Sequence, residues 1–138
     1  MKQILAAILA IAILSAMVLP VSAAVPEETV ASPRYSYIQS ASVNLIINDE
    51  TGMATCTSSC YASSEYVVYI DCMLQRYSGS SWTTLRTWIK SAKRYASIEE
   101  TWKVYSGYTY RVYSTFRIYN ASGTLLETGT NSKSVVFT

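Results

Sequence analysis

Aromatic and arginine side chains alternate along two segments of the chain in a pattern that suits sugar binding. If residues 66–77 and 108–119 are strands, every second side chain in them points to the same side. Ring faces accept the apolar C–H faces of sugars, and neighbouring amide, carboxylate and guanidinium groups bind the hydroxyls. The two tryptophans of the segment between them either extend this face or belong to another sheet. The candidate binding face consists of Tyr69, Asp71, Gln75, Tyr77, Trp82, Trp88, Arg111, Tyr113, Arg117 and Tyr119.

The same pattern also fits a purely structural role. Cross-strand pairs of such residues stabilise a sheet by about 0.2–1 kcal/mol each. Tyrosine and arginine also stack on each other without any ligand. The candidate face is therefore interpreted either as a binding surface or as ordinary sheet packing.

The chain does not have the residues of a recognisable catalytic site. It contains no histidine, which excludes Ser-His and Cys-His pairs, histidine metal sites and an imidazole pH switch. Asp71 is the only acid in the middle of an expected strand, whereas the adjacent Glu99 and Glu100 would point to opposite faces. Glycosidic chemistry needs two carboxylates facing one cleft. We therefore expect a protein that is not an enzyme and that uses neither a cofactor nor a metal.

Three cysteines suggest one disulfide in an exported protein. Cys56 and Cys72 fall on the apolar side of their segments, so a Cys56–Cys72 bridge is the first expectation and Cys60–Cys72 the second. A Cys56–Cys60 bridge would need a turn, because disulfides require Cα atoms within about 7 Å. The first bridge would contribute about 3 kcal/mol.

Length and charge exclude several other classes of protein. The chain of 138 residues is long enough for one domain. Its formal net charge of +2 is too small for a protein that binds nucleic acid by neutralising phosphates. With 12 Tyr and only 14% charged residues, it is also unlike a disordered chain.

The first residues have the layout of a secretory signal peptide. Lys2 precedes an apolar run, residues 4–19, which is shorter than the roughly 20 residues of a membrane span. Small residues follow it, and we place the cleavage after Ala23, with Ala24 as the alternative. The expected division is residues 1–23 as signal peptide, 24–34 as an extended segment and 35–138 as the folded domain. The protein is expected to be secreted, without a stable membrane anchor.

The remainder of the chain alternates with a period of two, which is typical of strands. Turn residues separate the segments, and the last one, from Thr124 onward, is expected to break near Gly129. In the fourth segment Leu85 and Ile89 are expected to face inward, and Arg86, Trp88 and Lys90 outward. About seven such strands predict an all-β fold, an antiparallel β-sandwich of immunoglobulin-like type. In that order the third and sixth strands are neighbours, and Tyr108 or Tyr110 occupies the tyrosine-corner position. The expected strands are residues 37–47, 53–59, 66–77, 82–91, 98–104, 108–119 and 124 onward.

Five short segments occur in an order that resembles a family of small secreted proteins of Gram-positive bacteria rich in Ser, Thr and Tyr. The resemblance covers roughly residues 54–128. It implies an exported β-domain and assigns no catalytic residue. The segments are 54–57, 74–77, 80–85, 107–112 and 119–123.

Together these features predict binding or contact outside the cell, at a polysaccharide or at a protein surface. The alternative is a passive structural protein that self-assembles through its last strand, residues 134–137, pairing with a neighbouring edge. The sequence leaves the oligomeric state open.

Overall fold

The computed structural model describes residues 34–63 and 65–138. The predicted signal peptide and nearly all of the segment 24–34 lie outside the described residues. The described part belongs to one unit, Pro33–Thr138. None of its elements is a helix of the length and apolarity that crossing a membrane requires.

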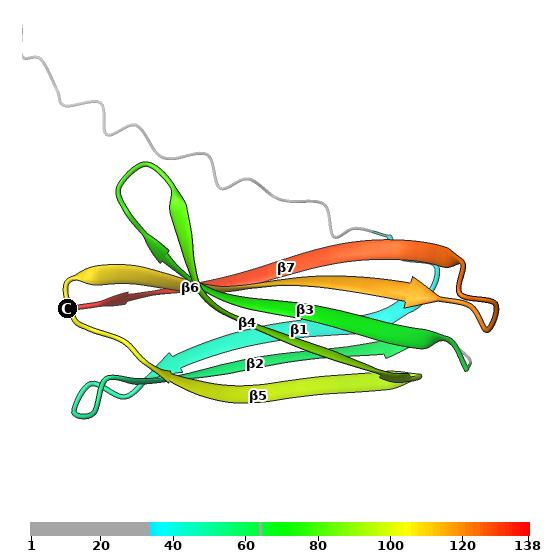
Figure 1. Cartoon of the computed structure of the whole chain (residues 1–138), viewed down its shortest axis with the longest axis horizontal. Helices are drawn as coiled ribbons and strands as arrows, with labels where there is room; N and C mark the ends of the chain where they lie inside the picture. The colour runs from blue at the N-terminus through cyan, green and yellow to red at the C-terminus, as the bar shows by residue number, and fades with distance from the viewer. Residues whose placement is uncertain (1–33, 64) are drawn as a thin grey trace, which may run out of the picture. The chain divides into compact units, whose positions relative to one another are not determined.

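The described residues form seven strands, as the period-two pattern predicts (Figure 1). Polar turns rich in Gly, Ser and Asn join most of them, and four turn glycines have positive φ, where a side chain would be strained. The strands are β1 (Ile38–Ile47), β2 (Met53–Ala62), β3 (Val67–Tyr77), β4 (Trp82–Lys93), β5 (Tyr95–Lys103), β6 (Tyr108–Tyr119) and β7 (Leu125–Phe137).

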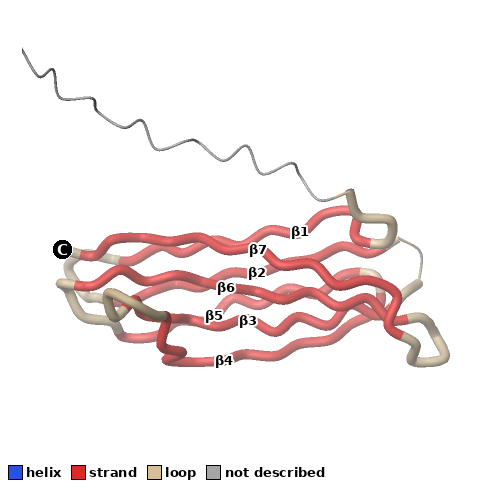
Figure 2. Tube along the Cα trace, turned by 90° about the horizontal axis from the view of Figure 1, so that it is seen from above, coloured by secondary structure: helices blue, strands red, loops and turns tan. Residues whose placement is uncertain are grey.

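These strands make two antiparallel sheets that face each other. One has the order β1-β2-β5 and the other the order β4-β3-β6-β7, seen from above in Figure 2. The expected pairing of the third and sixth strands is confirmed, because β3 pairs with β6 along ten residues from Val67↔Tyr119 to Arg76↔Tyr110. The fourth strand pairs with β3, whereas in a constant-type immunoglobulin domain it joins the other sheet. The predicted β-sandwich is confirmed.

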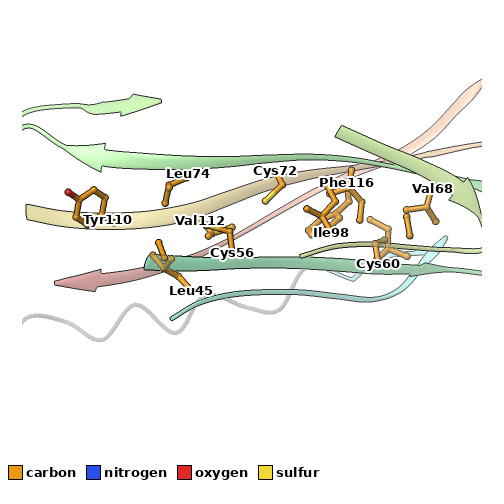
Figure 3. Close-up of a cluster of buried hydrophobic side chains, with 14 of the residues drawn as sticks. Leu45, Cys56, Cys60, Val68, Cys72, Leu74, Ile98, Tyr110, Val112 and Phe116 are labelled. Carbon is orange, nitrogen blue, oxygen red and sulfur yellow. The ribbon is translucent and has the colours of Figure 1, made fainter. Parts of the chain in front are cut away.

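The core lies between the sheets, where alternate residues of both meet (Figure 3). β2 and β6 lie between two neighbouring strands in their sheets, and they alternate most regularly between buried and half-buried positions. Burial of these apolar side chains is the main stabilising contribution to the fold. The largest fully buried apolar side chains are Tyr110, Phe116, Ile70, Leu74, Ile118, Val68, Val104 and Val112.

A β-bulge makes part of the predicted facing of β4 wrong. Between Leu74↔Arg86 and Gln75↔Thr84 the register shifts, and Leu85 is the extra residue. Two consecutive residues then face the same side, which reverses the parity of the rest of the strand relative to the prediction. Ile89, expected to be buried, is 58% exposed, whereas Trp88 lies opposite Cys72 and packs against the core.

The chain passes from one sheet to the other through a single residue between β4 and β5. Arg94 has φ 65°, a left-handed conformation that residues other than glycine rarely adopt. Its N–H donates to the carbonyl of Tyr66, and its own carbonyl accepts from the N–H of Ala62. These bonds hold the corner, and β5 begins three residues earlier than expected because residues 95–97 already pair with β2.

The predicted break in the last strand is also wrong, because β7 continues through Gly129 opposite Phe116. A Cβ at Gly129 would lie 2.8 Å from the hydroxyl oxygen of Tyr35 and 3.0 Å from Cδ1 of Ile38. The glycine therefore admits the Tyr35 side chain against the sheet and does not end the strand.

Candidate binding face

The outer face of the β4-β3-β6-β7 sheet carries most of the predicted binding residues. The register sets Gln75 opposite Arg111, and Tyr69 opposite Arg117. Directly opposite residues in an antiparallel pair point to the same side of the sheet. The aromatic and arginine residues of β3 and β6 therefore share one face, as the sequence predicts.

Five residues at one end of this face form a cluster centred on Arg111. The Arg111 guanidinium carbon lies 4.2 Å from the centre of the Trp82 ring and 4.9 Å from that of Tyr113. The Tyr77 and Trp82 rings are themselves 5.1 Å apart, at an interplanar angle of 47°. Both guanidinium contacts fall within the range of cation–π attraction. We call Gln75, Tyr77, Trp82, Arg111 and Tyr113 the Arg111 cluster.

A short series of hydrogen bonds fixes the orientation of the arginine. The Arg111 Nε–H donates to Gln75 Oε1 at 2.7 Å, and Gln75 Nε2 donates to Thr84 Oγ1 at 3.0 Å. Gln75 is only 8% exposed, and both the oxygen and the nitrogen of its amide have a hydrogen-bond partner, as buried polar groups require. Thr84, which the sequence analysis did not single out, completes the series because the bulge at Leu85 brings it opposite Gln75.

The bulge also shapes the surface around the cluster. Figure 1 shows the tip of the β3–β4 hairpin turning away from the plane of its sheet, next to the start of β6. Such bending is the usual effect of an extra residue in one strand of a pair. Tyr77 and Trp82 lie at this bent tip, opposite each other, and Tyr77 donates a hydrogen bond to the Gly79 carbonyl. The cluster is therefore built where the sheet surface changes direction.

A second arginine lies farther along the same face. The Arg117 guanidinium carbon is 5.8 Å from the centre of the Tyr69 ring, and Tyr119 follows two residues later on the same side of β6. Between the two arginines lies Asp71, opposite Thr115. Its Oδ1 atom is buried and has no hydrogen-bond partner among the described residues. A buried acceptor without a partner is costly, and because this atom is buried a ligand on the surface cannot reach it.

The prediction is wrong for one residue of the face. Trp88 packs against the core and is not on the outer face, because the bulge reverses the parity of β4. Other cation–π pairs escaped the sequence analysis: Arg76 lies 4.6 Å from the Tyr108 ring, and Arg86 lies 4.1 Å from the Trp102 ring. Arg86 and Trp102 belong to different sheets, so no pattern within one strand could reveal their contact.

The outer face of the other sheet has a different chemistry. Its residues are mainly small and hydroxylated, and the hydroxyls of Ser42 and Ser59 are 2.8 Å apart. Its one aromatic feature is the stacked pair of Tyr61 and Tyr95, with ring centres 4.2 Å apart. No arginine is paired with an aromatic ring on this face among the described residues. The two faces are thus chemically distinct.

The three cysteines are free and buried, unlike the expected Cys56–Cys72 or Cys60–Cys72 bridge. Cys56 and Cys60 lie on β2 and Cys72 lies on β3, so the thiols belong to facing sheets. Burial, and secondarily the nearby Cys72, raises the pKa of Cys56 to about 12. Burial and the charge of Glu127 raise the pKa of Cys60 to about 11. Such thiols are poor nucleophiles and poor metal ligands at neutral pH.

The described residues contain no group of three or more acidic or cysteine side chains placed to hold a metal ion. No protein family, no curated protein and no solved structure matches the chain. The resemblance to secreted Gram-positive proteins stays a prediction, and function has to be inferred from the geometry of this face.

Proposed function

We propose that the chain is a secreted, non-catalytic binding domain that holds a polysaccharide against the outer face of the β4-β3-β6-β7 sheet. The single observation that carries the proposal is the Arg111 cluster. Two rings and a guanidinium group converge there, and the buried Gln75 amide holds the guanidinium in place. Flat rings beside groups that bind hydroxyls are the combination that sugars require.

Exposure supports binding over packing alone. Tyr77 is 40% exposed at the hairpin tip, and Trp82, Arg111 and Tyr113 keep part of their surface in solvent. Cross-strand packing explains the ring contacts, and the surface that these side chains keep in solvent is available to a ligand.

Secretion belongs to the same proposal. It is supported by the apolar run at residues 4–19 and the small residues that follow it, and it fits the resemblance to exported proteins of Gram-positive bacteria. A surface of Ser, Thr and Tyr suits an extracellular β-domain that contacts a cell wall or a host glycan.

Tryptophan fluorescence tests the proposal directly. The protein is titrated with a panel of soluble cell-wall and host polysaccharides while its emission is recorded. We expect saturable quenching by at least one polymer, abolished by Tyr113→Ala. The control is Tyr61→Ala, which removes an exposed ring from the opposite outer face and should bind as the parent does. A folded protein that responds to no polymer would refute the sugar-binding function.

The second candidate function is passive self-assembly, favoured by the length of an edge strand. β7 has 13 residues at the edge of its sheet, and Val136 near its end is 66% exposed. Unprotected edges invite pairing with another chain. Removing residues 134–138 is a poor test because Phe137 belongs to the core. Val136→Lys is the better variant: an assembling protein should show concentration-dependent sedimentation that this charge suppresses, whereas a binding domain should sediment as one species with or without it.

A further inference from the structure

We infer that the polysaccharide is acidic, and that the Arg111 guanidinium binds a carboxylate of the sugar. The inference rests on the proposed polysaccharide-binding function and narrows its ligand to polymers that carry carboxylates. It follows from which ring faces already contact a guanidinium group and which hydrogen-bond donors have no partner.

The ring faces nearest the arginines are already covered. The guanidinium of Arg111 lies over the Trp82 ring, and that of Arg117 lies over the Tyr69 ring. A ring face that carries a guanidinium group cannot also stack on a neutral sugar. At both places the outer face therefore carries a guanidinium group paired with an aromatic ring, and the 40% exposed Tyr77 ring is left for stacking on a sugar.

Arg111 is held in place while most of its donors stay free. Its Nε–H is bound to Gln75, which Thr84 holds in turn. Within residues 34–63 and 65–138 this is the one side-chain hydrogen bond that Arg111 makes. The terminal nitrogens keep four N–H groups, in the planar arrangement that binds a carboxylate through two parallel hydrogen bonds. Because the side chain is ordered before binding, little conformational entropy is lost when the carboxylate arrives.

The outward charges of this face are mainly positive. By register, Arg111, Arg117 and Lys93 point outward together with a single acid, Asp71. The two arginines are six residues apart on β6, which is about 20 Å at 3.3 Å per residue. Asp71 lies between them and repels an anion, so the carboxylates of the polymer are expected to bind at the arginines and its hydroxyl groups to lie between them.

A pair of polymers that differ only in charge tests the inference. Polygalacturonate carries one carboxylate per sugar, and its fully methyl-esterified form has the same backbone without the charge. Binding of the protein to each is measured by isothermal titration calorimetry at low and at moderate salt. We expect the acid to bind at least about tenfold more tightly than the ester, as the loss of charge-assisted hydrogen bonds implies. Added salt should weaken binding of the acid and leave binding of the ester unchanged.

Matched arginine variants locate the effect. Arg111→Gln should weaken binding of polygalacturonate by about tenfold or more, and Arg111→Lys should restore only part of the loss because a lysine cannot make the paired hydrogen bonds. Arg86→Gln is the control. It removes the same charge from another cation–π pair, that with Trp102, and should change affinity less than about twofold. Circular dichroism confirms that each variant is folded.

The outcomes separate this inference from the proposed function. If ester and acid bind equally well and Arg111→Gln has no effect, the face binds neutral sugars and the acidic ligand is refuted. If Arg86→Gln weakens binding as much as Arg111→Gln, the attraction is a general charge effect and the assignment to Arg111 is refuted. If the folded protein binds neither polymer and no neutral glycan, the polysaccharide-binding function itself fails, and the inference with it.

Discussion

The hydroxyl of Tyr110 makes two hydrogen bonds to the backbone of Tyr105. It donates to the Tyr105 carbonyl at 2.7 Å and accepts from the Tyr105 N–H at 3.1 Å. Tyr110 is buried near the start of β6, and the bonds reach back to the segment that follows β5. This is a tyrosine corner, and it ties the crossing between the two sheets to the core. Of the two tyrosines predicted for this role, Tyr110 fills it.

The corner should therefore make a measurable contribution to stability. Tyr110→Phe keeps the buried ring but leaves both Tyr105 groups without their partner, so we expect the free energy of unfolding to fall by about 1–2 kcal/mol. Urea unfolding followed by circular dichroism measures the change. Tyr108→Phe is the control, because that ring is 43% exposed, and it should alter stability by less than about 0.5 kcal/mol. An equal loss in both variants would mean that the corner adds nothing specific.

Tyr110 also illustrates what the sequence can predict. Strict alternation with a period of two identified the strands and their buried sides, because these depend on local geometry and on burial. The neighbouring places of β3 and β6, and with them the shared face of Arg111 and Gln75, were expected from the immunoglobulin-like order of the strands. Alternation thus suffices wherever the register is regular.

The errors arise where one extra residue or a long-range contact decides the outcome. The bulge at Leu85 reverses the sides to which the Trp88 and Ile89 side chains point, and no residue of the local sequence indicates a bulge. In the sequence, Gly129 suggests a break in the strand. The structure shows that the Tyr35 side chain fills the space that a Cβ at Gly129 would need. Such features depend on residues distant in sequence, so they could not be predicted from the chain alone.

Glu127 should make the stability of the fold depend on pH. Burial raises the pKa of its carboxyl, but hydrogen bonds from the backbone N–H groups of Ser36, Ile38 and Tyr37 outweigh this, and the pKa lies below its usual value of 4.5. The bonds span 2.6–2.8 Å and fasten the beginning of β1 to β7. A carboxyl whose pKa is lowered by folding stabilises the folded state fully above its unfolded pKa, and the stabilisation is lost as the pH falls through the folded pKa.

Glu127→Gln should accordingly lower the free energy of unfolding by about 1–2 kcal/mol at pH 7, a value discounted for the partial exposure of the carboxylate. The difference from the parent should shrink as the pH falls below 4.5. Unfolding curves collected from pH 7 to pH 3 measure both. Glu50→Gln, in an exposed turn, is the control and should stay within about 0.5 kcal/mol of the parent. A loss that is independent of pH would show that the charge of Glu127 is not what stabilises the contact.

The three buried cysteines should be unreactive while the protein is folded. Their thiols have raised pKa values and are shielded from solvent between the sheets (Figure 3). Because the thiolate is the reactive form, a chromogenic disulfide reagent should modify none of them at pH 8 in the native protein and all three in denaturant. The reaction at intermediate urea should follow unfolding. Only one reactive thiol in the denatured, unreduced protein would show instead that two cysteines had formed a disulfide.

Two residues with left-handed backbone should respond to substitution in opposite ways. Arg94 has φ 65°, and Gly52 has φ 67°. A residue with a side chain destabilises the fold by about 1–2 kcal/mol when its φ is in the left-handed region. This applies to Arg94 and does not apply to Gly52, which has no side chain. Arg94→Gly should therefore raise the free energy of unfolding by up to about 1 kcal/mol, since the added freedom of the unfolded chain offsets part of the gain.

Gly52→Ala should lower it by about 2 kcal/mol or more, because two costs add. Besides the strained φ, the new Cβ would lie 2.7 Å from the carbonyl oxygen of Val104, which follows β5 and whose N–H donates to the Gly52 carbonyl. Gly79→Ala separates the two contributions. Gly79 also has a positive φ, 90°, but a Cβ there meets nothing within 4 Å, so only the backbone cost applies. Urea unfolding of the three variants should rank them Arg94→Gly, Gly79→Ala, Gly52→Ala from most to least stable. An Arg94→Gly protein less stable than Gly79→Ala would mean that the Arg94 side chain stabilises the corner by more than its backbone strain costs.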